Sequence, residues 1–115
     1  MSNAFEAKAA QLVAAFEQRL DQDKRELITN ANIARGDFVD TGLEPLRFIA
    51  HRIVGSARLF NCEHLSLPAK KVEDLVEQGA DISLVIDAVN NLIDQIDRTL
   101  TDGVPMPDWV KSQDT

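Results

Sequence analysis

Hydrophobic residues recur at intervals of three and four along four separate stretches of the chain. This spacing places the apolar side chains on one face of a helix. The first stretch predicts one helix over residues 4–35, with a candidate interruption at the charged residues 21–25. Gly36 stands where a left-handed residue would end this helix. The apolar positions of this first stretch are Phe5, Ala9, Leu12, Phe16, Leu20, Leu27, Ile28 and Ile33.

The second stretch follows a predicted loop over residues 36–40. Thr41, Gly42, Leu43 and Glu44 match a capping box, in which a hydroxyl and a carboxylate each bond a free N–H of the first turn. The sequence therefore predicts that the second helix starts at this box and runs to about residue 60.

The third helix has two candidate starting points. Ser66 could cap it, which would put Pro68 in the first turn, where a missing N–H costs little. A start near Cys62 would instead leave Pro68 inside the helix and strain it. Gly79 is expected to end this helix in either case.

The fourth helix is the clearest, since Asp81 can cap it and Gly103 can stop it. No strand pattern or internal repeat appears in the sequence. Four amphipathic helices with short connections predict an all-α, antiparallel up-down four-helix bundle over residues 1–103. Residues 104–115, which include Trp109, are predicted to form a C-terminal tail that packs back or frays.

Composition narrows the class of protein. A chain of 115 residues is long enough for one domain, and 44% apolar residues with only 5% aromatics suit a helical bundle. No apolar run approaches the length of about 20 residues of a membrane span. The single Cys62 allows no intrachain disulfide and fits a reducing compartment, so we expect a cytoplasmic protein.

The charge is unevenly distributed along the chain. The net charge of −7 argues against nucleic acid or an anionic membrane as a partner. Residues 46–71 nevertheless contain five basic residues and one acidic residue, a local charge of +4. Such a region could steer an acidic partner to one face, although helix faces also vary in charge without any function.

His51 lies in the middle of the second predicted helix, on the side opposite its apolar residues. On a helical wheel Arg47, Gly55 and Arg58 lie within about 40° of it. Glycine inside a helix costs about 1 kcal/mol relative to alanine, so Gly55 indicates that space is needed there. Close helix packing could also need that space, but the outer face favours a binding role.

The run from His51 to Ala57, followed by Leu65, Ala69, Val72 and Glu73, resembles the histidine-containing phosphotransfer (HPt) domains of bacterial two-component phosphorelays. Most of residues 5–102 follow the family's pattern. Two positions depart from it. Val54 replaces the lysine three residues after the histidine, and Asn61 replaces a glycine that often follows.

The resemblance implies a phosphocarrier that is not an enzyme, in which His51 accepts a phosphoryl group from one receiver-domain aspartate and donates it to another. The expected partners are response-regulator receiver domains or a hybrid histidine kinase. The carrier itself is expected to be a monomer. It is expected to need no cofactor, because the receiver supplies magnesium. The residues expected to support phosphate or partner are Arg47, Arg52, Gly55 and Arg58, and those expected to dock the partner are Phe48 and Val54. We hypothesise that Arg47 and Arg58 substitute for the missing lysine.

Two alternatives stay open. The chain could be a non-catalytic interaction module, an adaptor or inhibitor that has lost phosphotransfer, and Val54 favours this reading. It could also be a dimeric structural bundle. Cys62 and His64 have no second ligand pair at zinc spacing, so we expect no metal site, and no nucleotide-binding loop or hydrolase motif appears.

Overall fold

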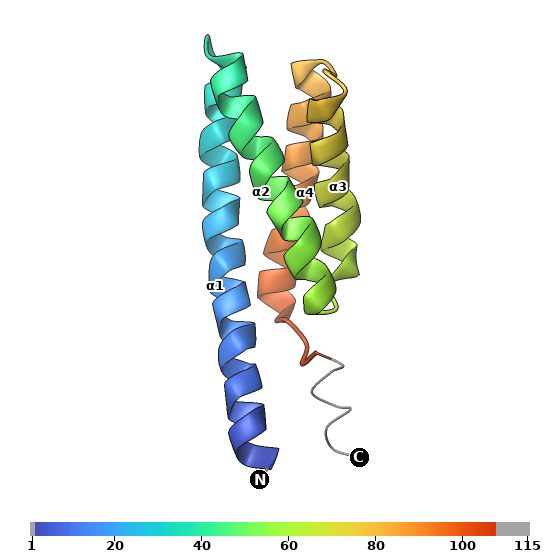
Figure 1. Cartoon of the computed structure of the whole chain (residues 1–115). Coiled ribbons are helices and arrows are strands. Elements are labelled where there is room, and N and C mark those ends of the chain that lie inside the picture. The colour runs from blue at the N-terminus through green and yellow to red at the C-terminus, as the bar shows by residue number, and fades with distance from the viewer. Residues whose placement is uncertain (1, 108–115) are drawn as a thin grey trace.

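In the computed structural model, which describes residues 2–107, the chain forms four helices: α1 (Ser2–Arg35), α2 (Val39–Leu59), α3 (Glu63–Glu77) and α4 (Ile82–Asp102). Successive helices run in opposite directions (Figure 1). There is no strand in this part of the chain. The predicted all-α four-helix bundle is therefore confirmed.

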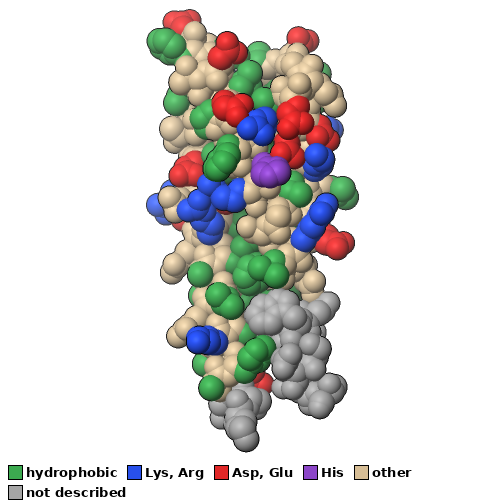
Figure 2. All heavy atoms as spheres, viewed as in Figure 1, with side chains coloured by type: hydrophobic (Ala, Val, Ile, Leu, Met, Phe, Trp, Pro, Cys, Tyr) green, Lys and Arg blue, Asp and Glu red, His purple; other side chains and the backbone are tan. Residues whose placement is uncertain are grey.

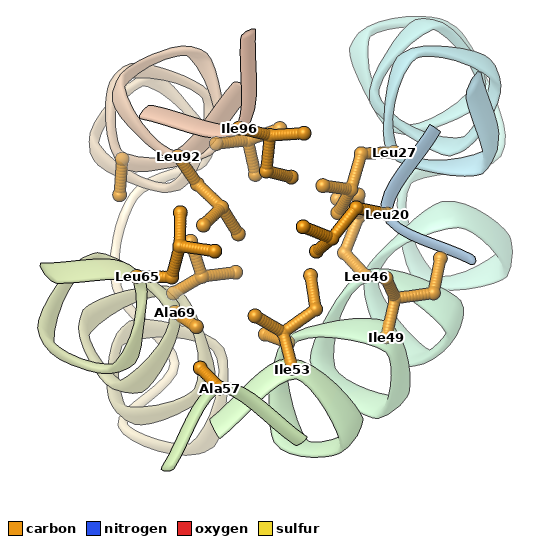
Figure 3. Close-up of a cluster of buried hydrophobic side chains, with 14 of the residues drawn as sticks. Leu20, Leu27, Leu46, Ile49, Ile53, Ala57, Leu65, Ala69, Leu92 and Ile96 are labelled. Atoms are coloured by element: carbon orange, nitrogen blue, oxygen red, sulfur yellow. The ribbon is translucent and has the colours of Figure 1, made fainter. Parts of the chain in front are cut away.

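Each helix packs against its neighbour in the chain, and α4 returns to α1 to close the bundle. Leucine and isoleucine side chains from all four helices point to the common centre (Figure 3). Complete burial of such side chains contributes about 1.5–3 kcal/mol each, which makes this centre the main source of stability. The members that are at most 1% exposed include Leu20, Leu27, Leu46, Ile53, Leu65, Leu92 and Ile96.

Helix α1 is continuous over its 34 residues, and the candidate interruption at residues 21–25 does not occur. The charged residues there stabilise the helix through pairs four residues apart, with Arg25 2.8 Å from Asp21 and Arg19 3.5 Å from Asp23. The N-terminal end of α1 extends beyond the other helices, within a molecule of 56 × 21 × 20 Å (Figure 1).

The predicted tail contacts α1 at its first residue, Val104. The Val104 N–H donates to the Glu17 carboxylate at 3.3 Å, and the Val104 side chain packs against the core. Trp109 lies outside the described residues.

The predicted start of α2 was wrong. The helix begins at Val39, after Phe38, whose side chain makes no capping bond, so Thr41 and Glu44 do not form a capping box. Gly42 instead lies where α2 crosses α1. A Cβ at Gly42 would lie 2.4 Å from the Asn30 carbonyl oxygen and 2.7 Å from the Ala34 nitrogen.

The two turns before and after α2 differ from their predicted conformations. Gly36 follows the last residue of α1 but is not left-handed. Asn61, where the related domains often have glycine, does have a positive φ of 57°. Asparagine tolerates this conformation better than most residues, so the replacement keeps the turn between α2 and α3.

Helix α3 takes the earlier of its two candidate starts, at Glu63 after Cys62, and Pro68 lies inside it. The Cys62 N–H bonds the Ala57 carbonyl at 2.8 Å, which ties the start of α3 to the end of α2. The ends of α3 and α4 agree with expectation, because Gly79 and Gly103 have positive φ values of 69° and 85°. Asp81 precedes α4, but its side chain makes no capping bond.

Candidate functional site

His51 projects from the middle of α2 into solvent, and its side chain is 69% exposed. Its neighbours Ala50 and Ile53 are buried in the core, which fixes the face of α2 that carries the histidine. A histidine lies among basic and acidic side chains on the visible face of the bundle (Figure 2).

The imidazole is held by a carboxylate from α3. His51 Nδ1 lies 2.5 Å from Glu73 Oε2, and the Glu73 side chain is only 6% exposed. A carboxylate can only accept a hydrogen bond, so Nδ1 donates to Glu73, and in the neutral ring the lone pair is then on Nε2. Nε2 makes no hydrogen bond within the described part of the chain. The geometry thus presents Nε2 as the available nucleophile.

Lys70 lies one turn before Glu73 on α3 and shares its carboxylate with the histidine. Lys70 Nζ lies 3.3 Å from Glu73 Oε1 and 3.1 Å from Asp74 Oδ1. Hydrogen bonds to Asp74 and then to Glu73 raise the pKa of Lys70, so its ammonium stays charged. One buried carboxylate therefore connects an ammonium and an imidazole.

Arg47, one turn before His51, is fixed between two acidic side chains. Its Nη2 lies 2.5 Å from Glu44, and its Nη1 lies 3.8 Å from Glu77 of α3. The bond to Glu44 raises the pKa of the Arg47 guanidinium and lowers that of the Glu44 carboxyl. The Arg47 cation is thus accompanied by two carboxylates, of which Glu44 lies just before the basic region of residues 46–71 and Glu77 belongs to another helix.

Arg52 turns away from His51 toward α1. It pairs with the buried Asp23 and lies 3.3 Å from Glu26, while its guanidinium carbon is 5.7 Å from the centre of the Phe48 ring. Burial raises the pKa of Asp23, against the opposing effect of Arg52. Arg52 Nε is buried without a partner in the described structure. These contacts couple Phe48, which is 57% exposed, to the α1–α2 interface.

Gly55 and Arg58 continue the outer face of α2 beyond His51. A Cβ at Gly55 would meet nothing within 4 Å, so the surface there is open. Arg58 lines a cavity of about 330 Å³ together with Glu63, Ser66 and Leu67 of α3. Val54, also predicted to dock a partner, is only partly exposed and packs against the core.

Sequence reasoning missed the contacts that connect these residues across helices. The sequence indicates Glu73 only as part of the pattern shared with HPt domains, and Lys70 only as one of the five basic residues within residues 46–71. Asp23 was considered only as one of the charged residues 21–25, although an aspartate on the apolar side of α1 was an available signal of a buried ion pair.

The other candidate ligands serve the packing of the bundle. His64 Nε2 lies 2.7 Å from Thr99 Oγ1 of α4, and the buried Cys62 thiol donates to the Phe60 carbonyl at 3.5 Å. Burial raises the pKa of the Cys62 thiol. In residues 2–107 there is no group of three or more side chains arranged to hold a metal ion, and no helix that is long and apolar enough to cross a membrane.

Fold and site together define a four-helix bundle that displays one histidine, oriented by a buried carboxylate, on an open helical face. The family model of the Hpt domain matches residues 1–102 of the 115 residues. The chain therefore belongs to the Hpt domain family, whose members act in phosphorelays as phosphocarriers rather than as true enzymes, alongside receiver domains and histidine kinases. No curated protein and no solved structure matches the chain.

Proposed function

We propose that His51 accepts a phosphoryl group from the aspartyl phosphate of one receiver domain and passes it to the aspartate of another. The observation that carries this proposal is the contact between His51 Nδ1 and the buried Glu73 carboxylate, which occupies Nδ1 and leaves Nε2 of the exposed ring as the nitrogen open to a phosphoryl donor. Membership of the Hpt family supports the same role.

In the proposed transfer, Nε2 attacks phosphorus, the N–P bond forms, and the P–O bond to the receiver aspartate breaks. The aspartate leaves as a carboxylate and takes the electron pair of that bond. Because Nδ1 keeps its proton, the phosphorylated ring is cationic, and the Glu73 carboxylate stabilises it. Return of the phosphoryl group to a receiver aspartate restores the neutral ring.

The face around His51 suits a docked receiver. Phe48 and Val54 would contact it, and Gly55 would let its aspartyl phosphate approach the ring. Arg47 and Arg58 would face the acidic pocket of the receiver. Arg52 would support the Phe48 ring, over which its guanidinium lies. No cofactor is proposed for this chain, because the magnesium ion belongs to the receiver.

The test mixes receiver domains carrying labelled phosphate with the wild-type protein, with His51→Gln and with His64→Gln. His64 is the matched control, being the chain's other histidine but bonded to Thr99. Label should appear on wild type and on His64→Gln, and not on His51→Gln. It should be acid-labile and alkali-stable, as a phosphoramidate is, and ³¹P–¹H NMR should locate it on Nε2. Label on His51→Gln would refute the proposal.

A second candidate is an interaction module without phosphotransfer. It is favoured by Val54, which stands where related domains carry a lysine. Under this proposal receivers would bind both wild type and His51→Gln, and neither would acquire label.

A further inference from the structure

Phosphorylation of His51 would bring a dianion to a surface that already carries several acidic groups. Glu73, Asp74 and Glu77 of α3 and Glu44 of α2 all lie in ion pairs around the histidine. Val54 supplies no positive charge, and it packs against the core. A phosphoryl group on His51 therefore needs a cation from a position other than 54, because it would otherwise be destabilised by the negative charges of the neighbouring carboxylates.

We infer that Lys70 of α3 binds the phosphoryl group on His51, in place of the lysine that is absent from position 54 of α2. The inference rests on the proposed function and specifies which residue of this chain completes its site.

Contact geometry carries the inference. Lys70 and His51 bind the two oxygens of one carboxylate, Lys70 at Oε1 and His51 at Oε2 of Glu73. The carboxylate group alone separates the ammonium from the ring. Glu73 is buried and fixed, whereas the Lys70 side chain is 53% exposed. Because a lysine side chain is a flexible chain of four methylene groups, its ammonium can reach the edge of the His51 ring.

The other cations of this region are less suited to the role. Arg47 is held by Glu44 through both Nε and Nη2, so reaching a phosphoryl group would break three hydrogen bonds. Arg58 lies seven residues from His51, about 10 Å along the helix axis. Lys71 lines a different cavity, between α3 and α4, with Leu84 and Asp87.

Movement of Lys70 would also change which charged groups surround Glu73, the partner of the imidazole ring. In the free protein Glu73 interacts with both Lys70 and His51. When Lys70 turns to the phosphoryl oxygens, Glu73 is left to balance the cationic phosphorylated ring alone. Asp74 also loses the ammonium in this movement, but its side chain is 41% exposed and is hydrated instead, whereas the buried Glu73 keeps the ring as its partner.

The experiment compares wild type, Lys70→Met and Lys71→Met for phosphoryl transfer from a labelled receiver. Lys71→Met is the matched control, since it removes the same charge one residue away on another face. Lys70→Met should lower the transfer rate and the fraction of phosphorylated protein at equilibrium by about threefold to tenfold. Lys71→Met should leave both close to wild type. Circular dichroism checks that each variant is folded.

Two further measurements separate phosphoryl binding from a structural role. The second pKa of the phosphoryl group, followed by its ³¹P shift, should rise in Lys70→Met because a neighbouring cation is lost. Introducing Val54→Lys into the Lys70→Met protein should restore transfer, because it returns an ammonium to the position used by the related domains.

Transfer and ³¹P titration that are the same in Lys70→Met as in wild type would overturn the inference. An equal loss in Lys71→Met would overturn it too, because general charge would then explain the effect. Absence of label on wild type would instead count against the proposed function itself, so the two failures are distinguishable.

Discussion

Replacing Gly55 by alanine should make the protein more stable and less able to transfer phosphate. Gly55 is exposed, lies inside α2, and has no atom within 4 Å of the position that a Cβ would occupy. The added methyl group therefore causes no clash within the folded chain. Glycine at an exposed helical position costs about 1 kcal/mol relative to alanine, and Gly55→Ala should recover about that amount.

For a domain of this size, a gain of 1 kcal/mol corresponds to a rise in Tm of about 4–8 °C. Function should change in the opposite direction, because the methyl group would lie one turn from His51 on the side that a receiver must approach. A displacement of reacting groups by about 1 Å can slow a reaction about 100-fold, so we expect transfer to fall by about tenfold to 100-fold.

The assay measures thermal unfolding by circular dichroism and transfer from a labelled receiver on the same samples. Ser56→Ala is the control, since it raises helix propensity at the next residue without adding an atom to the open face. A more stable Gly55→Ala protein with unchanged transfer would refute the reasoning that this glycine gives a partner access. A less stable protein would show that the space at Gly55 is not open.

Three other predictions concern single contacts. Gly42→Ala should destabilise the protein by about 1–3 kcal/mol in urea unfolding, because its Cβ would overlap the backbone of α1; an unchanged unfolding midpoint would contradict this. The fully buried Cys62, with its raised thiol pKa, should react with a thiol reagent only as fast as the protein unfolds, and rapid native labelling would disprove it. The pKa of Glu44 is lower in the folded state than its ordinary 4.5, so its pair with Arg47 contributes stability that is present above pH 4.5 and is lost as the pH falls through the folded pKa. The difference in unfolding free energy between wild type and Glu44→Gln should shrink in that range, and a constant difference would count against the pair.

Local patterns predicted the four helices, and together with the family resemblance the up-down topology, but they did not predict all helix starts. Periodicity located four helices because each buries one apolar face, and that property depends on near neighbours in sequence. The predicted start of α2 was wrong because Thr41 and Glu44 match a capping box locally, whereas the helix begins at Val39 and Gly42, in its first turn, packs against α1. Such a contact depends on how two helices cross, which a single segment does not reveal.

The same distinction applies to the site. The exposure of His51 followed from the helical wheel, since it depends on α2 alone. The pairing of His51 with Glu73 spans 22 positions of the chain and requires the arrangement of two helices. The direction of Arg52 was unpredictable for the same reason, because its partners Asp23 and Glu26 belong to α1.

The proposed chemistry depends on the register between α2 and α3 more than on either helix alone. The nucleophile lies on α2, while the carboxylate that orients it and the ammonium beside it lie on α3. Ala57 and Ala69 are completely buried in the core these helices share, and the small side chains allow close packing (Figure 3). A slip of one residue along α3 would move Glu73 by about 1.5 Å and turn it by about 100°, away from His51 Nδ1. The core that holds the bundle together therefore also sets which imidazole nitrogen bonds Glu73 and which is left for the proposed transfer.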